Sequence, residues 1–167
     1  MARKLPKIRQ YEGIKQARSM KVDYIPYQKQ FRSQIEKMML SLYQEDPAGL
    51  GIDCNKINAT ILECTRHPEK VKLLTIWYGG ELAGYALIVF FWSNEYGGNI
   101  LCLDEIYIKE AFRSLGIGSR TIGDMPGIFP ESTAISLEVT PSNSRAKLFY
   151  ERLGFTQKEN LSMIRIL

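Results

Sequence analysis

A glycine-containing loop between a strand and a helix is the feature that most constrains how this chain can fold. The loop is Arg113-Ser114-Leu115-Gly116-Ile117-Gly118-Ser119, and it follows a strand-like run over residues 99–108. Gly116 and Gly118 allow a tight turn and a close backbone approach to a ligand. The amides around them would lie at a helix N-terminus, where the helix dipole favours an anion. This order of elements indicates a site for a phosphorylated ligand.

Two other phosphate-binding motifs are excluded by the same residues. A Walker loop requires Gly-Lys-Ser/Thr, which this loop lacks, and a dinucleotide fingerprint requires a third glycine where the chain has Thr121. Taken alone, the loop is better explained as an ordinary turn between a strand and a helix than as a ligand site. The segments after the loop are therefore needed to interpret it.

A second strand and an amphipathic helix follow the loop and favour the ligand site. Residues 134–139 are predicted as the strand. The helix has one apolar face at i, i+3, i+4 and i+7, formed by Ala146, Phe149, Tyr150 and Leu153. Gly154 is its C-terminal cap, and Asn143 lies where an N-cap or a ligand contact is expected. The Tyr150 hydroxyl can reach the edge of the packed face.

The other elements follow from periodicity and turn residues. The predicted elements are a strand over residues 21–27, a helix over 28–43, a helix over about 55–65, strands over 71–78 and 82–92, and a final hairpin over 156–159 and 162–167. Asp53 or Asn55 is expected to cap the second helix. The helix after the glycine loop contains Gly123, Pro126 and Gly127, so we expect it to end after about two turns.

One globular domain accounts for most of the chain. Its 167 residues, 45% of them hydrophobic, can bury one sizeable core. Residues 1–21 contain seven Lys and Arg residues and one Glu, whereas the remainder has 15 basic and 17 acidic residues. We therefore expect a basic N-terminal extension over residues 1–20, a single domain over residues 21–167, and no nucleic-acid footprint across that domain.

The cysteines and the apolar runs indicate in which cellular compartment the protein is expected. The three cysteines form no CxxC pair, so neither a disulfide framework nor a zinc site is indicated. The longest apolar run, residues 85–92, is too short to span a bilayer, and no signal-peptide pattern opens the chain. We expect a cytoplasmic protein that uses no metal and does not contact a membrane.

Several motifs together resemble the GNAT superfamily, N-acyltransferases that use acetyl-CoA. Residues 113–118 resemble its Arg/Gln-x-x-Gly-x-Gly/Ala pyrophosphate loop, and residues 105–108 resemble the strand before that loop. The last helix is similar at Asn143, Ala146, Phe149-Tyr150 and Leu153-Gly154-Phe155. The resemblance covers residues 21–167 and leaves residues 1–20 outside.

The resemblance implies an α/β (α+β) fold with a mixed, mostly antiparallel sheet of six to seven strands, splayed between its two central strands and flanked by about four helices. The pantetheine arm of acetyl-CoA would enter the opening beside residues 99–108. The amide of Ile106 would polarise the thioester, and the amides of residues 113–118 would hold the pyrophosphate. The implied cofactor-binding residues are Ile106, Tyr107, Ile108, Arg113, Ser114, Leu115, Gly116, Ile117, Gly118, Ser119, Asn143 and Tyr150.

The resemblance also implies direct attack of a primary amine on acetyl-CoA in a ternary complex. The amine must lose a proton before it attacks, and the CoA thiolate must gain one as it leaves. Tyr150 is the candidate acid toward the sulfur. Glu105 and Glu138 are the candidate bases, acting directly or through water, and each also fits an ordinary solvated or paired carboxylate. Asp104 alternates to the face opposite Glu105.

A second class of function remains open: a catalytically inactive GNAT-fold module that binds acyl-CoA or a partner. The Tyr150 hydroxyl and the complete glycine loop favour the enzyme. Ser/Cys-His hydrolysis is excluded because the single histidine, His67, is predicted to lie in a loop beside Pro68. The sequence does not specify the acceptor, a small-molecule amine or a protein amine. A monomer and a homodimer are both compatible with an exposed sheet edge.

Overall fold

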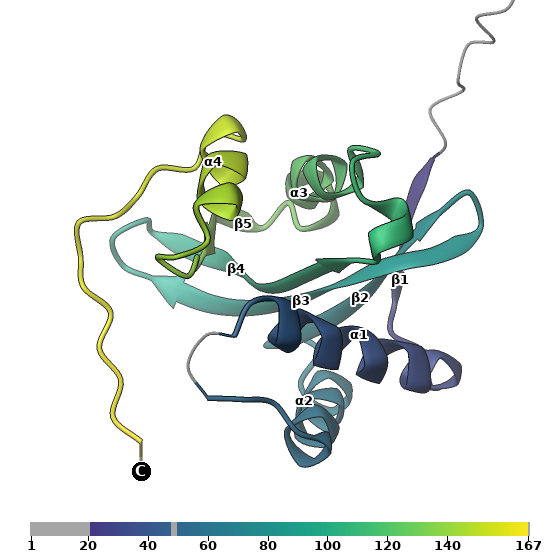
Figure 1. Cartoon of the computed structure of the whole chain (residues 1–167). Coiled ribbons are helices and arrows are strands. Elements are labelled where there is room, and N and C mark those ends of the chain that lie inside the picture. Colours follow the sequence, from purple (N-terminus) through teal and green to yellow (C-terminus); the bar gives the residue numbers. More distant parts are fainter. Residues whose placement is uncertain (1–20, 48–49, 167) are drawn as a thin grey trace, which may run out of the picture.

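A five-stranded sheet lies at the centre of the computed structural model, which describes residues 21–47 and 50–166 (Figure 1). In spatial order the strands are β1 (Val22–Pro26), β2 (Val71–Tyr78), β3 (Glu81–Ser93), β4 (Gly98–Ile108) and β5 (Ser132–Leu137). The first four are antiparallel to their neighbours, and β5 is parallel to β4. The predicted mixed, mostly antiparallel sheet is confirmed. The basic extension predicted for residues 1–20 lies outside the described residues.

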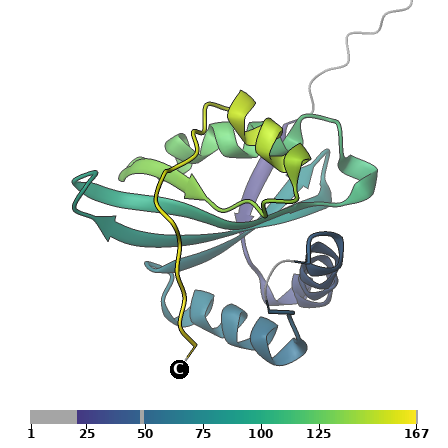
Figure 2. The same ribbon diagram turned by 60° about the vertical axis from the view of Figure 1, so that its left-hand side comes forward.

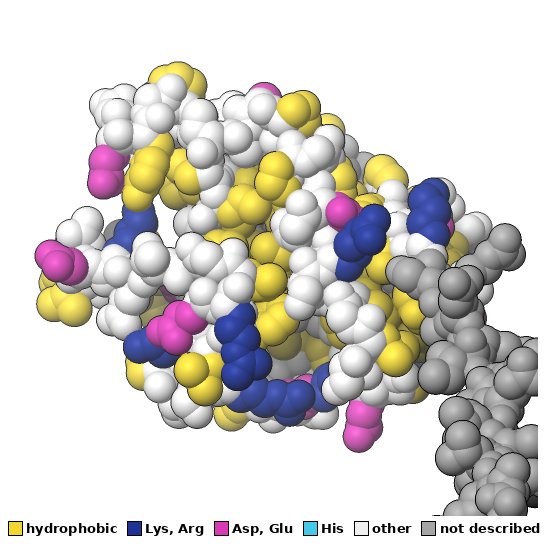
Figure 3. Space-filling model, turned by 90° about the horizontal axis from the view of Figure 1, so that it is seen from above, with side chains coloured by type: hydrophobic (Ala, Val, Ile, Leu, Met, Phe, Trp, Pro, Cys, Tyr) yellow, Lys and Arg dark blue, Asp and Glu magenta, His cyan; other side chains and the backbone are white. Residues whose placement is uncertain are grey.

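Within the described chain, two α-helices cover each face of the sheet, which gives the four helices that the sequence predicts (Figure 1, Figure 2). α1 (Arg32–Glu45) and α2 (Cys54–Arg66) lie on one face, and α3 (Ile117–Ile128) and α4 (Ser144–Arg152) lie on the other. Short 3-10 turns at Lys29–Phe31 and Glu110–Phe112 precede α1 and α3. Seen from above, hydrophobic side chains show along the middle of the face that carries α3 and α4 (Figure 3).

Each face of the sheet has its own core, and a bulge in β4 decides which residues join which core. Leu87 pairs with Glu105, but the next residue of β3, Ile88, pairs with Leu103, so Asp104 is an extra residue in β4. Leu103 accordingly packs in the core beneath α3, whereas Tyr107 packs in the core with α1 and α2. Without the bulge, residues 103 and 107 would share one face.

The pairing between β4 and β5 ends before β4 does. It runs from Asn99 opposite Ser132 to Leu103 opposite Leu137. Within the described residues, positions 105–108 of β4 therefore pair with β3 alone, and the bulge residue Asp104 pairs with neither neighbour. This is where we expected the sheet to open.

Most element boundaries agree with the sequence within a few residues, and the caps have the expected chemistry. The Asp53 side chain accepts a hydrogen bond from the Lys56 amide at the start of α2, at 2.9 Å. Gly79 and Gly80 both have positive φ, 61° and 85°, as a tight hairpin turn requires. The predicted turn between β2 and β3 is confirmed.

Two expectations about the C-terminal half are wrong. The sheet of the described residues has five strands and not six or seven, because residues 156–166 form no hairpin. Leu161, Met163 and Ile164 are more than 90% exposed (92%, 94% and 93%), so their strand-like pattern has no neighbour to pair with. Residue 167, the last of that predicted hairpin, is outside the described residues.

α3 is also longer than predicted, with 12 residues including Pro126. A proline inside a helix removes one backbone hydrogen bond and crowds the preceding turn. Ile122 and Met125 are buried beneath the helix, and the Phe129 amide still reaches the Met125 carbonyl at 2.8 Å. Burial of this face holds the helix together past the proline.

We expect Gly84→Ala to destabilise the fold by about 2–3 kcal/mol, the scale of overpacking in a tight core. A Cβ at Gly84 would lie 2.1 Å from the Tyr107 carbonyl oxygen across the β3–β4 pair. Gly123→Ala is the matched control, because a Cβ there meets nothing within 4 Å, and removing a helix glycine should stabilise by about 0.5–1 kcal/mol. Urea unfolding of both variants measures the difference. Equal stability of the two would contradict the close approach of β3 and β4.

Candidate functional site

The glycine loop leads into an N-terminus of α3 that no side chain caps among the described residues. Gly116 is the N-cap and has a left-handed backbone, with φ 76°, and Ser114 also has positive φ at 63°. By contrast, α2 and α4 are capped by the side chains of Asp53 and Asn143. The first amides of α3 are thus available to an anion, with the helix dipole directed favourably.

Some backbone groups at the end of β4 point away from β3, toward the side where no described strand pairs with it. The Lys109 amide, just beyond β4, donates to the Ala83 carbonyl in β3, at 2.9 Å. Along an antiparallel pair, residues alternate between bonding to the partner strand and pointing away from it. Ile106 and Ile108 therefore direct their amides and carbonyls away from β3. Consistently, the Ile108 carbonyl accepts a hydrogen bond from the Arg113 Nε, at 2.8 Å.

The Arg113 side chain extends toward α1. One guanidinium nitrogen, Nη2, lies 2.8 and 2.7 Å from the two carboxylate oxygens of Glu45, and the guanidinium lies 5.3 Å from the centre of the Tyr107 ring. The Arg113 amide donates to the Glu110 carbonyl at 3.1 Å. The side chain therefore joins the loop to the end of α1, a contact between residues 68 positions apart that no local sequence pattern signals.

Glu105, one of the two predicted bases, is buried on the α1 side of the sheet. Its carboxylate accepts a hydrogen bond from the Tyr85 hydroxyl at 2.8 Å. Burial raises the pKa of the Glu105 carboxyl above its ordinary value, and hydrogen bonds from Tyr85 and Tyr43 oppose this rise. A carboxyl with a raised pKa is suited to general-base work near neutral pH. Sequence reasoning missed both tyrosines.

Glu138, the other predicted base, lies one residue beyond the end of β5 and is exposed. Asp104, the bulge residue, lies near it: burial raises the pKa of the Asp104 carboxyl, and the charge of Glu138 raises it further. The structure thus gathers carboxylates from β4 and from the end of β5 around the opening. The bulge that presents Asp104 there could not be read from the alternation of side chains.

Tyr150 lies on α4 within a small aromatic cluster. Its ring centre is 5.1 Å from that of Phe149 and 5.7 Å from that of Phe155. Burial raises the pKa of the Tyr150 hydroxyl, and the nearby charge of Asp46 raises it further. The hydroxyl therefore keeps its proton at neutral pH. Asp46 is the C-cap of α1, so the end of that helix contributes to this part of the site as well.

Asn143 uses both ends of its amide. Its Oδ1 accepts from the Ala146 amide at 3.0 Å, which confirms the predicted N-cap of α4. Its Nδ2 donates to Asp46 Oδ2 at 2.8 Å. The residue proposed from sequence as a ligand contact therefore also connects α4 to α1.

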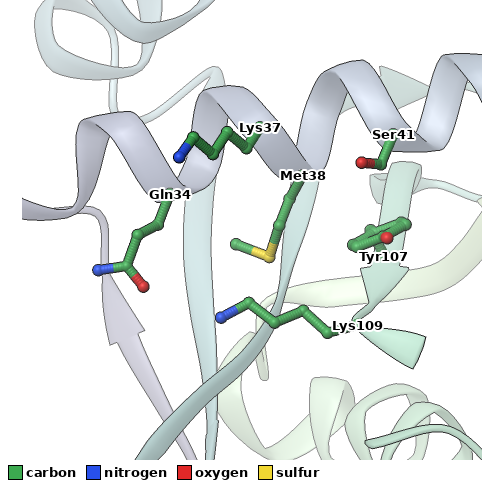
Figure 4. A pocket seen from close by; sticks show the side chains of 6 residues that line it. All are labelled: Gln34, Lys37, Met38, Ser41, Tyr107 and Lys109. Carbon is green, nitrogen blue, oxygen red and sulfur yellow. The ribbon is translucent and has the colours of Figure 1, made fainter. Parts of the chain in front are cut away.

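A pocket of about 210 Å³ lies between α1 and the end of β4. Figure 4 shows α1 passing above Tyr107 and Lys109, with Met38 and Ser41 over them. Of the predicted site residues, Tyr107 lines this pocket. α3 and α4, which carry the uncapped N-terminus and Tyr150, lie on the opposite face of the sheet (Figure 1, Figure 2).

A family model described as Acetyltransferase (GNAT) family matches residues 36–155. This chain belongs to the GNAT acetyltransferase family. The match extends from within α1 to just beyond α4 and so includes the glycine loop and every residue of the site described above. No helix of the described residues is long and apolar enough to cross a membrane.

Individual relatives agree with this family. A thialysine N-epsilon-acetyltransferase from Bos taurus is 35% identical over 78 residues, which are 46% of this chain and 45% of that protein. The match thus spans less than half the length of that relative.

Two solved structures show the same fold. One, a possible acetyltransferase from Clostridium difficile 630, has a TM-score of 0.74 at 18% identity and covers 87% of this chain and 98% of its own. The other, AAC(6')-Iy in complex with the bisubstrate analog CoA-S-monomethyl-acetylneamine, has a TM-score of 0.70 at 16% identity, with coverage of 88% and 99%.

We expect Tyr85→Phe to raise the pKa of Glu105 further. The lost hydrogen bond stabilises the charged carboxylate, whereas the burial that disfavours the charge stays. A ¹³C NMR titration of the Glu105 carboxyl measures the change. Tyr24→Phe is the control, because that hydroxyl bonds Asp124 at the opposite face. A Glu105 pKa that stays the same or falls in Tyr85→Phe would show that the bond does not act on the carboxylate.

Proposed function

We propose that this GNAT protein transfers an acetyl group from acetyl-CoA to a primary amine by direct attack in a ternary complex. One observation carries the proposal: the free edge of β4, with the amides of Ile106 and Ile108 directed outward, leads within a few residues to the uncapped N-terminus of α3. A thioester-bearing arm and a diphosphate need donors in that order along one strand and loop.

The residues present fit the co-substrate. The amides at the start of α3, with Gly116 and Gly118 beside them, would hold the pyrophosphate. A Cβ at Gly116 would meet nothing within 4 Å, so the backbone there is open to a ligand. The Ile106 amide would polarise the thioester carbonyl, and Asn143 lies across the opening from β4. Acetyl-CoA supplies the activated acyl group, and the protein holds it against the amine.

In this proposal, side chains on the two faces of the sheet carry out the proton transfers. The amine must be neutral to attack, and Glu105, whose pKa is raised by burial, is our choice of base, directly or through water. Glu138, exposed beside Asp104, is the alternative base. Tyr150 keeps its proton at neutral pH, because burial raises its pKa, and can pass it to the leaving thiolate.

We propose that the acceptor of the acetyl group is an amine. The relative named above is a thialysine N-epsilon-acetyltransferase, and the solved neighbour holds an analog made of CoA and acetylneamine. Both names concern an amino group as the acyl acceptor. A small-molecule amine and a protein amine both fit this class, and we propose no single compound.

Release of CoA from acetyl-CoA tests the proposal directly. We expect free thiol above the hydrolysis blank when the protein and acetyl-CoA meet a panel of diamines, amino acids, aminoglycosides and peptides. The chemistry predicts that the rate rises with the neutral fraction of the amine. CoA binding by calorimetry, without thiol release on any amine, would replace the enzyme by a non-catalytic acyl-CoA-binding module. No binding at all would end both proposals.

We expect Tyr150→Phe to lower kcat by about 100-fold or more, the usual size of a lost proton donor, with CoA affinity changed by less than about twofold. The phenyl ring keeps the aromatic packing with Phe149 and Phe155, so the variant should stay folded. Tyr96→Phe is the matched control, since Tyr96 is exposed in the turn between β3 and β4. An unchanged kcat in Tyr150→Phe would remove the tyrosine from the acid role.

A further inference from the structure

Glu45, the last residue of α1, and Asp46, the C-cap that follows it, are attached to opposite sides of the opening in the sheet. Glu45 binds Arg113, which lies five residues beyond the end of β4. Asp46 binds Asn143, which lies six residues beyond the end of β5. Because β4 and β5 run parallel, their ends lie at the same edge of the sheet, one on each side of the opening. Two adjacent carboxylates thus bridge it.

The bridge lies where backbone pairing has stopped. Beyond Leu103 and Leu137 the described residues of β4 and β5 share no ladder hydrogen bonds, so the distance between their ends is set by side chains and loops. Each anchor has a further bond to backbone: the Arg113 Nε donates to the Ile108 carbonyl, and the Asn143 Oδ1 accepts from the Ala146 amide. The bridge therefore joins two parts that are each held in place.

The bond between Glu45 and Arg113 has more to do with position than with overall stability. The two side chains are 46% and 35% exposed, and ion pairs with that exposure contribute little to folding, because water screens the attraction. The geometry is nonetheless specific, since both Glu45 oxygens are engaged and the Tyr107 hydroxyl donates to one of them at 3.3 Å. Tyr107 itself belongs to β4, at the edge of the opening.

We propose that Glu45 and Asp46 are positioning residues, which set the width of the opening for the pantetheine arm and hold the glycine loop ready for the diphosphate. The inference rests on the proposed function, because it assigns a role in binding CoA. It also connects the segment after α1 to the co-substrate, since Asp46 begins that segment. Neither carboxylate needs to touch CoA for this role.

Calorimetric titration with CoA tests the Glu45 side of the bridge. We expect roughly fivefold weaker binding for Glu45→Gln and for Arg113→Gln, the size of one well-formed ion pair. The double variant should bind no more weakly than the weaker single variant, because both changes break the same bond. Effects that multiply in the double variant would show that Glu45 and Arg113 act separately, against the proposal.

The matched control is Glu63→Gln, which breaks the bond between Glu63 and Lys70 far from the opening. That pair has a similar distance, 2.9 Å, and similar exposure, 39% and 60%. We expect small and similar decreases in melting temperature for Glu63→Gln and Glu45→Gln, but unchanged CoA affinity for Glu63→Gln. Equal loss of CoA affinity in the two variants would mean that general stability, and not position, is responsible.

Two substitutions separate the hydrogen bond of Asp46 from its charge. Asp46→Asn keeps an oxygen that accepts from Asn143 and should bind CoA almost as the unaltered protein does, whereas Asp46→Ala should bind it roughly fivefold more weakly. Equal weakening by both would overturn the bridging role of Asp46. If the unaltered protein gives no heat with CoA, the proposed function is refuted. If the unaltered protein and Glu45→Gln bind CoA with the same affinity, only this inference is refuted.

Discussion

The change of partners along β4 is the constraint on which the rest of the structure depends. From Asn99 to Leu103 the strand is paired on both sides, and after the bulge at Asp104 it is paired with β3 only, from Glu105 onward. A backbone edge left without a strand partner needs other groups for its amides and carbonyls. Arg113 satisfies the carbonyl of Ile108, and the outward amides remain available to a ligand that carries acceptors of its own.

The end of α1 brings the separate parts of the site together. Tyr43 hydrogen-bonds Glu105 on one face of the sheet, and two residues later Glu45 meets Arg113. Asp46 then meets Asn143 and raises the pKa of Tyr150 through its charge. Between positions 43 and 46, the end of α1 and its C-cap thus contact the buried carboxylate, the glycine loop and the start of α4. A helix that packs on one face of the sheet thereby connects groups from both faces.

Local patterns predicted the parts of this site that local forces build. The left-handed glycine at 116 and the N-cap at Asn143 follow from the residues themselves and their neighbours. The bulge at Asp104 could not be predicted, because an extra residue changes the alternation without any residue type that marks it. The contact between Glu45 and Arg113 was also missed, since it depends on how α1 lies across the sheet.

The C-terminal segment shows the opposite error. Leu161, Met163 and Ile164 have the composition of a strand, and composition cannot tell whether a neighbouring edge is within reach. The prediction that α3 ends early, near Pro126, is wrong for a related reason. Burial of Ile122 and Met125 outweighs the one backbone hydrogen bond that the proline removes. In both cases tertiary contacts decided what local preference left undetermined.

The bonds that complete the site join positions far apart in the chain, 97 residues for Asp46 with Asn143 and 68 for Glu45 with Arg113. Contacts of such long range are slow to form, because bringing their ends together costs loop-closure entropy. α4 is short, with nine residues, none of them fully buried. Its amide hydrogens should exchange with solvent before those of the central strands. Local unfolding of α4 can therefore displace Tyr150 and Asn143 while the sheet stays folded.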